Sequence, residues 1–433
     1  MLYYSTGNNA PQAGLGKAIV KGLAEDRGLY MPERIKRLPD EFFDKIGEYS
    51  FHEVALMAAE AFFGEDVDSE SLERIVSDTL SFDCPIVNVE DNIWSLELFH
   101  GPTLAFKDVG ARFMARLLSY FIDPSEGGTV HVLVATSGDT GSAVANGFLG
   151  VPGIHVHVLY PKGKVSPIQE AQFTTLGQNI SAIAVDGVFD DCQALVKNAF
   201  MDEELNAHMR LTSANSINVA RFLPQSFYYF WAYAQLKRMN KAENVVVCVP
   251  SGNFGNICSA LFAKEMGLPI KRFIAANNAN DVFYKYLQSG EYVPQASIAT
   301  IANAMDVGNP SNFERILELY GGSWERIKQV VSGTVTTDDM IASTIRDCRR
   351  RTGYILDPHG ACAYRSLREG LAEDEVGIFC ETAHPAKFKD TVDGILGENI
   401  EVPAKLAAFM RGEKRIIGLP KDFDTFKNYL MAL

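Results

Sequence analysis

The chain has 433 residues, of which 47% are hydrophobic and 22% are charged, and its formal net charge is -14. A chain of this length and composition can bury a large core, which excludes disorder as its main state. The acidic balance provides no basic footprint for nucleic acid or anionic lipid, and leaves room only for a local basic pocket that binds a small anion.

Membrane and export signals are not expected in this chain. Its first nine residues have no basic region followed by an apolar one. No apolar run approaches the roughly 20 residues that cross a bilayer, and the richest one, Phe227–Ala234, indicates a core helix or a subunit contact. Seven cysteines are scattered without a Cys-x-x-Cys pair, so we expect reduced core thiols in a cytoplasmic protein.

The predicted elements change in character along the chain. Residues 1–85 have mostly helical patterns, and the alternating stretch at 92–99 predicts a strand. Beyond it, β-branched runs alternate with helical stretches such as Asp190–Phe200. The predicted strands are Thr129–Ala135, Ile154–Leu159, Ser181–Val185, Val245–Val249, Arg272–Ala276 and Val376–Cys380. Strands that alternate with helices imply right-handed crossovers and buried, mainly parallel sheets.

We therefore predict an α/β fold with two mainly parallel open sheets, preceded by a helical N-terminal region. Ligands of such sheets gather at the carboxyl ends of the strands, so a cleft between the sheets is the expected site. The predicted parts are an N-terminal region, a large domain, a smaller domain and a C-terminal segment. They comprise residues 1–85, residues 86–99 with 204–405, residues 100–203 and residues 406–433, respectively.

Lys107 is the first candidate for chemistry. It follows Leu104, Ala105 and Phe106 and begins a run whose apolar residues recur at helical spacing. A lysine held against apolar neighbours loses hydration of its charged form, so its pKa falls and the neutral amine can attack a carbonyl. This is the chemistry of a Schiff-base lysine. The alternative is a lysine at a helix start whose amine reaches solvent.

Two predicted strand ends carry loops that suit anions. Thr136–Ser142 brings hydroxyls and glycines to a helix start, where backbone N–H groups favour a carboxylate; an ordinary capped helix is the alternative. Pro250–Asn256 brings glycines to another helix start and lets the backbone approach a phosphate. Because this loop is neither a Gly-x-Gly-x-x-Gly fingerprint nor a Walker loop, it favours a single phosphate over a dinucleotide.

Two further clusters are polar. Asn215–Arg221 offers amide, hydroxyl and guanidinium groups, which a bidentate phosphate clamp requires. Glu381–Phe388 follows the last predicted strand directly and puts Thr382 at a strand end that faces the expected cleft.

Together these segments resemble the threonine synthase family, which are pyridoxal-phosphate enzymes of the tryptophan synthase β-subunit fold, also called fold type II. The resemblance covers nearly the whole chain and includes three long strings. They are His-Gly-Pro-Thr-Leu-Ala-Phe-Lys-Asp at 100–108, Ala-Met-Asp-Val-Gly-Asn-Pro-Ser-Asn-Phe-Glu-Arg at 304–315, and Thr-Ala-His-Pro-Ala-Lys-Phe at 382–388.

The resemblance implies a set of cofactor residues. Lys107 would carry pyridoxal 5'-phosphate as a Schiff base, and Thr382 would hydrogen-bond the pyridine nitrogen. A hydroxyl at that position should leave the ring nitrogen largely neutral and the ring a weaker electron sink. The residues that would hold the cofactor phosphate are Gly252, Asn253, Phe254, Gly255 and Asn256.

One residue departs from many relatives of this fold, which have asparagine where this chain has Asp139. That side chain would lie near the phenolic oxygen of the cofactor. A carboxylate beside a phenolate is repulsive unless one of them keeps a proton, so we expect the pair to share one.

The resemblance also implies the reaction, a carbon–oxygen lyase reaction that releases phosphate. O-phosphohomoserine would lose its γ-phosphate, water would add at Cβ, and threonine would form, with the Lys107 amine moving protons. The implied substrate residues are Thr136, Ser137, Gly138 and Thr140 for the carboxylate, and Asn215, Ser216 and Arg221 for the phosphate. The expected partner is thus a small molecule, with no nucleic acid and no membrane, in a monomer or homodimer.

Two alternative functions remain at this stage. One is another enzyme of the fold, such as a serine or threonine dehydratase or a sulfhydrylase, and the other is a non-catalytic protein that binds the cofactor or phosphate. Among other candidates, His155 and His157 form a pair without a third ligand at zinc spacing. Lys162 and Lys164 could bind phosphate or be solvated, and His384 and Lys387 could belong to the cleft wall.

Overall fold

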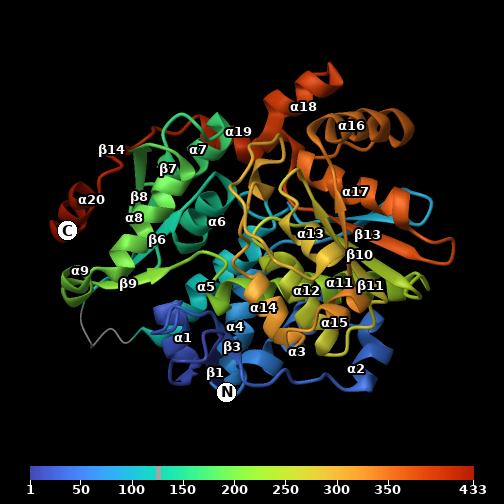
Figure 1. The fold of residues 1–433 in the computed structure, drawn as a ribbon, viewed down its shortest axis with the longest axis horizontal. Helices are drawn as coiled ribbons and strands as arrows, with labels where there is room; N and C mark the ends of the chain where they lie inside the picture. Colours follow the sequence, from blue (N-terminus) through green and yellow to red (C-terminus); the bar gives the residue numbers. More distant parts are fainter. Residues whose placement is uncertain (123–127) are drawn as a thin grey trace. The chain divides into compact units, whose positions relative to one another are not determined.

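The structure, a computed structural model, describes residues 1–122 and 128–433 and divides into two compact units (Figure 1). Unit 1 comprises Met1, Met31–Phe106 and Phe222–Glu401, and unit 2 comprises Leu2–Tyr30, Lys107–Arg221 and Val402–Leu433. The four predicted domain ranges stay a prediction, and the fold is described here by these two units.

Unit 1 is built on a six-stranded sheet with the order β12-β11-β10-β13-β5-β4. All neighbours are parallel except β4 and β5, which are antiparallel. The strands are β4 (Ile86–Glu90), β5 (Ile93–Glu97), β10 (Val245–Pro250), β11 (Arg272–Asn277), β12 (Val331–Val335) and β13 (Val376–Glu381). Every residue of β10 and β13 is buried, as expected for central strands covered on both faces.

Helices cover this sheet and extend the N-terminal part of unit 1. They are α2 (Asp40–Lys45), α3 (Phe51–Phe63), α4 (Ser69–Thr79), α11 (Phe227–Arg238), α12 (Gly255–Glu265), α13 (Val282–Ser289), α14 (Phe313–Leu319), α15 (Trp324–Val330), α16 (Asp338–Thr352), α17 (Pro358–Gly370) and α18 (Lys389–Leu396). Short 3-10 turns are η1 (Ile46–Glu48), η3 (Leu223–Ser226), η4 (Asn303–Met305) and η5 (Pro385–Phe388). Helix α11 is a core helix: Trp231 stacks on Phe51 of α3 at a ring-centroid distance of 5.3 Å.

Unit 2 is built on a five-stranded parallel sheet with the order β14-β8-β7-β6-β9. The strands are β6 (Val130–Ala135), β7 (Ile154–Pro161), β8 (Ile180–Asp186), β9 (Arg210–Ser213) and β14 (Ile416–Pro420). The helices are α1 (Leu15–Lys21), α5 (Lys107–Phe121), α6 (Asp139–Phe148), α7 (Pro167–Thr174), α8 (Phe189–Met201), α9 (Glu203–His208), α10 (Val219–Phe222), α19 (Ala404–Met410) and α20 (Phe423–Met431). The short strands β1 (Leu2–Ser5) and β2 (Ala13–Gly14) pair antiparallel, and β3 (Tyr30–Pro32) spans the limit between the units.

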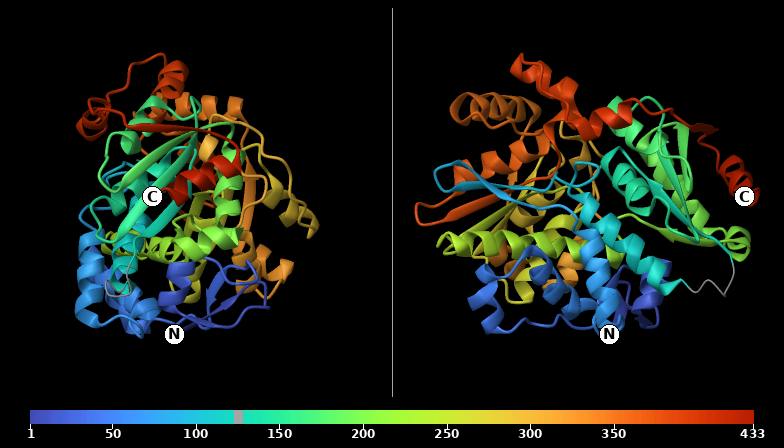
Figure 2. Two further views of the ribbon diagram at one scale, coloured as in Figure 1. Left: turned by 90° about the vertical axis from the view of Figure 1, so that its left-hand side faces the viewer. Right: turned by 180° about the vertical axis from the view of Figure 1, so that it is seen from behind.

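Apolar side chains on one face of the unit 2 sheet form its core. Leu133, Leu159 and Ile183, from three neighbouring strands, join Leu195 of α8 in one buried cluster. The last helix, α20, adds Phe426 to this cluster, and Figure 2 shows this helix in dark red at the C-terminus. Burial of such side chains stabilises the fold by about 1.5–3 kcal/mol each.

The predicted fold class is confirmed: both sheets are mainly parallel and the N-terminal region is largely helical. Every strand predicted from a β-branched run is present, with ends that differ by a few residues at most. Across residues 1–122 and 128–433, none of the helices has the length and apolar character that a bilayer crossing requires.

Candidate active site

The segment that leads into Lys107 is fixed by backbone pairing within unit 1. Phe106 N donates to Thr382 O at 2.8 Å, and His384 N donates to Leu104 O at 3.1 Å. Between them, Ala105 and Ala383 form an antiparallel bridge. Lys107 is the next residue along the chain and therefore directly follows the residue that is bonded to Thr382.

Two further features hold this segment in one conformation. The Nζ atom of the buried Lys387 donates to Thr103 O at 2.8 Å. Leu104 has a φ of 57°, in the left-handed region, which a branched side chain rarely adopts. Such strain persists only where surrounding contacts impose it, and it is common at functional sites. Lys107 itself begins helix α5 and is half-buried.

The predicted phosphate loop follows β10 and leads into helix α12. Phe254, the residue before the helix, has a φ of 63°, so this turn also contains a left-handed non-glycine residue. The buried Oδ1 atom of Asn256 accepts from Tyr228 Oη at 2.7 Å and from Tyr229 Oη at 2.6 Å. Because Oδ1 accepts both of these bonds, the other atom of the amide, Nδ2, remains as a donor.

Asn256 Nδ2 is a buried donor that has no acceptor within the described protein. Backbone N–H groups at the start of a helix such as α12 also lack intrahelical acceptors, and the helix dipole favours negative charge there. An orphaned amide donor at a glycine-containing helix start is the chemistry that a phosphate group requires. The residues from Gly252 to Asn256 therefore fit the phosphate of the predicted cofactor.

Thr382 lies at the same edge of the unit 1 sheet as this turn. Strands β10 and β13 are parallel neighbours, with Cys248 opposite Phe379, so their carboxyl ends meet side by side. Thr382 follows β13 directly and is 7% exposed. Unit 1 thus brings together the turn, Thr382 and the segment that ends before Lys107.

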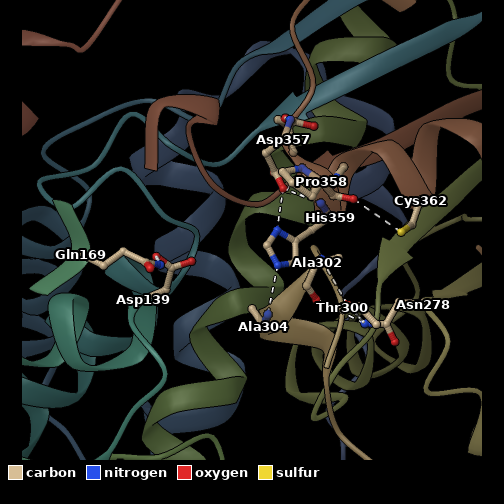
Figure 3. Close-up of polar contacts among 12 residues, drawn as sticks. Asp139, Gln169, Asn278, Thr300, Ala302, Ala304, Asp357, Pro358, His359 and Cys362 are labelled. Atoms are coloured by element: carbon tan, nitrogen blue, oxygen red, sulfur yellow. Dashed lines mark hydrogen bonds and ion pairs between the residues drawn. The ribbon is translucent and has the colours of Figure 1, made fainter. Parts of the chain in front are cut away.

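The Thr136 loop of unit 2 is fixed from within. Thr136 Oγ1 accepts from Gly138 N at 2.9 Å and from Gly141 N at 2.8 Å. These two N–H groups are therefore occupied, and an anion at this loop would be held by other groups, such as those of Ser137 and Thr140. The buried Asp139 begins helix α6, and its Oδ1 accepts from Gln169 Nε2 at 2.9 Å (Figure 3).

The predicted phosphate clamp also lies in unit 2, where Asn215 and Ser216 occupy the turn after β9. Asn215 Nδ2 donates to Ala135 O at 3.3 Å, which ties this turn to the end of β6. Arg221 is 1% exposed and its Nη1 donates to Ala214 O. Burial lowers the pKa of Arg221 to about 10, while the charge of Asp108 acts in the opposite direction. The guanidinium therefore stays charged at neutral pH.

Comparisons with known proteins fit this arrangement. The family model for pyridoxal-phosphate dependent enzymes matches residues 81–380, and models for the threonine synthase N terminus and C-terminal part match residues 2–80 and 359–430. Threonine synthase of Escherichia coli is 43% identical over 433 residues, which span 100% of this chain and 99% of that protein. The chain belongs to the threonine synthase family.

Solved structures of threonine synthases agree with this assignment. The crystal structure from Escherichia coli superposes with a TM-score of 0.93 at 43% identity and 100% coverage of both chains. The structure of the enzyme from Brucella melitensis, described as bound to pyridoxal phosphate, has a TM-score of 0.93 at 36% identity and covers 100% of this chain and 99% of that one. The predicted family, fold, threonine synthase function and cofactor are confirmed.

Some residues that contact the candidate site residues were not predicted. Tyr228 and Tyr229, which donate to Asn256, lie in a helix whose aromatic run indicated a core helix or a subunit contact. His359 and Asp357 were not singled out, although they connect to the 304–315 string. That string was noticed for its length, which gave no indication that Ala304 contacts a residue 55 positions further along the chain.

The remaining candidates lie among other side chains or in solvent. His155 and His157 stack with His131 in unit 2, and His131 Nδ1 lies 3.0 Å from His157 Nε2. Among residues 1–122 and 128–433, no group of three or more His, Cys, Asp or Glu side chains is arranged to hold a metal. Lys162 and Lys164 are exposed, which fits solvated lysines.

His384 Nδ1 accepts from Ala386 N at 3.1 Å and caps a short 3-10 turn. Burial lowers the pKa of His384 to about 4, although the charge of Glu97 acts to raise it. This imidazole is therefore neutral near pH 7.

Proposed function

We propose that this chain converts O-phosphohomoserine and water into threonine and inorganic phosphate, with Lys107 as the catalytic residue. One observation supports the role of Lys107 most strongly. The segment before it pairs with residues 382–384, through Phe106 N to Thr382 O at 2.8 Å and the bridge between Ala105 and Ala383. Lys107, which carries the amine, therefore directly follows a residue that is paired with Thr382, the proposed partner of the ring nitrogen.

The residues of unit 1 would hold the cofactor. Gly252–Asn256 would bind the phosphate through backbone N–H groups and Asn256 Nδ2, and the Thr382 hydroxyl would hydrogen-bond the pyridine nitrogen. Bound pyridoxal phosphate supplies an electron sink for negative charge at the substrate carbons. The Lys107 amine then moves protons, which requires it to be neutral for part of the cycle.

The residues of unit 2 would bind the substrate. Ser137 and Thr140 would hold its carboxylate at the start of α6, and Arg221 would pair with its phosphate together with Asn215 and Ser216. A guanidinium that stays charged while buried is suited to a dianionic group, because its charge is weakly screened there. This second phosphate site separates the proposed reaction from a dehydratase, which would not need it.

The oligomeric state and the location stay predictions. We propose a monomer or homodimer in the cytoplasm. The location is supported by the cysteines: all seven lie within the described residues, where each is buried with a free thiol.

Release of inorganic phosphate from O-phosphohomoserine, measured with threonine formation, tests the proposal. Lys107→Ala should abolish both products, whereas Lys162→Ala, a change at an exposed lysine, should leave them unchanged. Arg221→Lys keeps the charge but loses the planar fork, so we expect KM to rise about tenfold or more, with Arg411→Lys as an exposed control. Keto-acid formation from serine without phosphate release would instead identify a dehydratase, and no turnover of either substrate would identify a binding protein.

A further inference from the structure

Residues 298–312, called the strap here, cross unit 1 between helices α13 and α14. The strap contains most of the 304–315 string, which no step of the proposed function uses. It includes the short turn η4 and is otherwise irregular. Its contacts lead to the turn that would hold the cofactor phosphate.

The strap packs directly on that turn. Ser311 N donates to Asn253 Oδ1 at 2.7 Å, and Asn312 Nδ2 donates to Asn253 O at 3.0 Å. At Gly252, a Cβ atom would lie 2.5 Å from Ala304 O, so only a glycine allows the strap to come this close. The position of Ala304 therefore determines how much space is left beside Gly252.

Ala304 is fixed by a histidine from helix α17. Ala304 N donates to His359 Nε2 at 3.1 Å, and His359 Nδ1 lies 2.6 Å from Asp357 Oδ1 (Figure 3). A backbone N–H can only donate, so Nε2 must be the acceptor and the ring proton must be on Nδ1. Asp357 thus sets the tautomer that lets His359 hold Ala304. Both side chains are buried, at 2% and 0% exposure.

The strap has a second, separate anchor beside this one. Asp306 accepts from Thr300 N at 3.0 Å, from Thr300 Oγ1 at 2.7 Å and from Asn278 Nδ2 at 2.8 Å. The two Thr300 bonds lie within the strap, and the Asn278 bond fixes it to the residue that follows β11. Loss of His359 would therefore free Ala304 without releasing the whole strap, which makes its role separable by mutation.

We propose that His359, oriented by Asp357, is a positioning residue. Its hydrogen bond to Ala304 N holds the strap beside Gly252 and so determines the geometry of the phosphate-binding turn. This inference rests on the proposed role of that turn in holding the cofactor. It assigns His359 no contact with the substrate or the cofactor.

Two substitutions of His359 separate its contact with Ala304 from its contact with Asp357. In His359→Gln the amide oxygen can occupy the place of Nε2 and accept from Ala304. In His359→Asn the shorter amide can still donate to Asp357 but does not reach Ala304. His155→Asn, which removes a histidine bonded to Ser181 in unit 2, is the matched control.

The experiment compares the purified holoenzymes by hydrogen exchange and by the loss of pyridoxal phosphate on dialysis. For His359→Asn we expect faster exchange in residues 298–312 and about tenfold weaker retention of pyridoxal phosphate, the usual scale for one lost buried hydrogen bond. His359→Gln and His155→Asn should retain it as the unmodified protein does.

Retention by His359→Asn equal to that of the unmodified protein would overturn the inference, and so would a His359→Gln variant as weak as His359→Asn. Should His359→Asn not fold, His359→Leu is the second variant. It fills the buried site but offers Ala304 N no acceptor, so it should behave as His359→Asn was expected to. Failure of the proposed function is distinct: the unmodified protein would then release no phosphate from O-phosphohomoserine, while retention of pyridoxal phosphate and exchange in the strap would still respond to His359.

Discussion

Replacing Gly252 by alanine tests how closely the phosphate-binding turn is packed. The new Cβ would lie 2.5 Å from Ala304 O and 3.0 Å from the Cα of Met305. Both are backbone atoms, so no side-chain rotation can relieve the contact. The strap would have to move, against the hydrogen bonds that His359 and Asp306 provide.

The expected cost follows from this geometry. Overpacking of a close-packed site costs about 1–3 kcal/mol, which corresponds to roughly 5- to 150-fold in affinity if the cost falls on the cofactor-bound state. Gly394→Ala is the matched control within unit 1, because a Cβ there meets nothing within 4 Å. Since Gly394 lies inside helix α18, its change to alanine should stabilise the protein by about 0.5–1 kcal/mol.

The assay is a titration of the apoprotein with pyridoxal phosphate, followed by absorbance, together with thermal unfolding of both variants. Gly252→Ala should bind at least fivefold more weakly, and Gly394→Ala should bind normally. If Gly252→Ala kept the affinity of the unmodified protein within twofold, the packing of the strap on this turn would not determine cofactor binding.

Three other predictions concern charge. Burial, followed by the charge of Asp357, raises the pKa of Glu381 well above its usual range, so stability is lost as pH rises from about 4.5. The melting temperature of Glu381→Gln, relative to that of the unmodified protein, should therefore increase from pH 5 to pH 8. A difference that stays constant with pH would contradict this. Burial lowers the pKa of His131 to about 4, so stability is lost as pH falls from about 6.5 towards 4. Between pH 7 and pH 5, the free energy of unfolding measured in urea should fall by about 1 kcal/mol less in His131→Gln than in the unmodified protein, after a discount for the partial exposure of His131. Asp139→Asn should shift the pH dependence of the cofactor absorbance, and an unchanged profile would refute a shared proton.

The sequence alone predicted the two mainly parallel sheets, because their central strands are short, continuous apolar runs. Val245–Val249 is buried on both faces, and such strands consist of continuous β-branched residues. Strand β14 was not predicted, because its aliphatic residues are interrupted by Gly418 and followed by Pro420, two residues that are unusual in strand interiors.

The sequence located candidate site residues by type, and their roles stay predictions. Thr136 was expected among the residues that bind the substrate carboxylate, and the structure shows that its Oγ1 accepts from two backbone N–H groups of its own loop. Sequence spacing does not determine where a side chain points. His359 was missed for a related reason, because its contact with Ala304 depends on how two distant segments meet at the sheet edge.

The central claim is that Lys107 bears the reactive amine. Reduction of the holoenzyme with borohydride, followed by peptide mapping, locates the lysine that is bonded to the cofactor. We predict that the label is on Lys107 and that it is lost in Lys107→Ala. A label on Lys387, the buried amine that donates to Thr103 O, or on any other lysine would contradict the account.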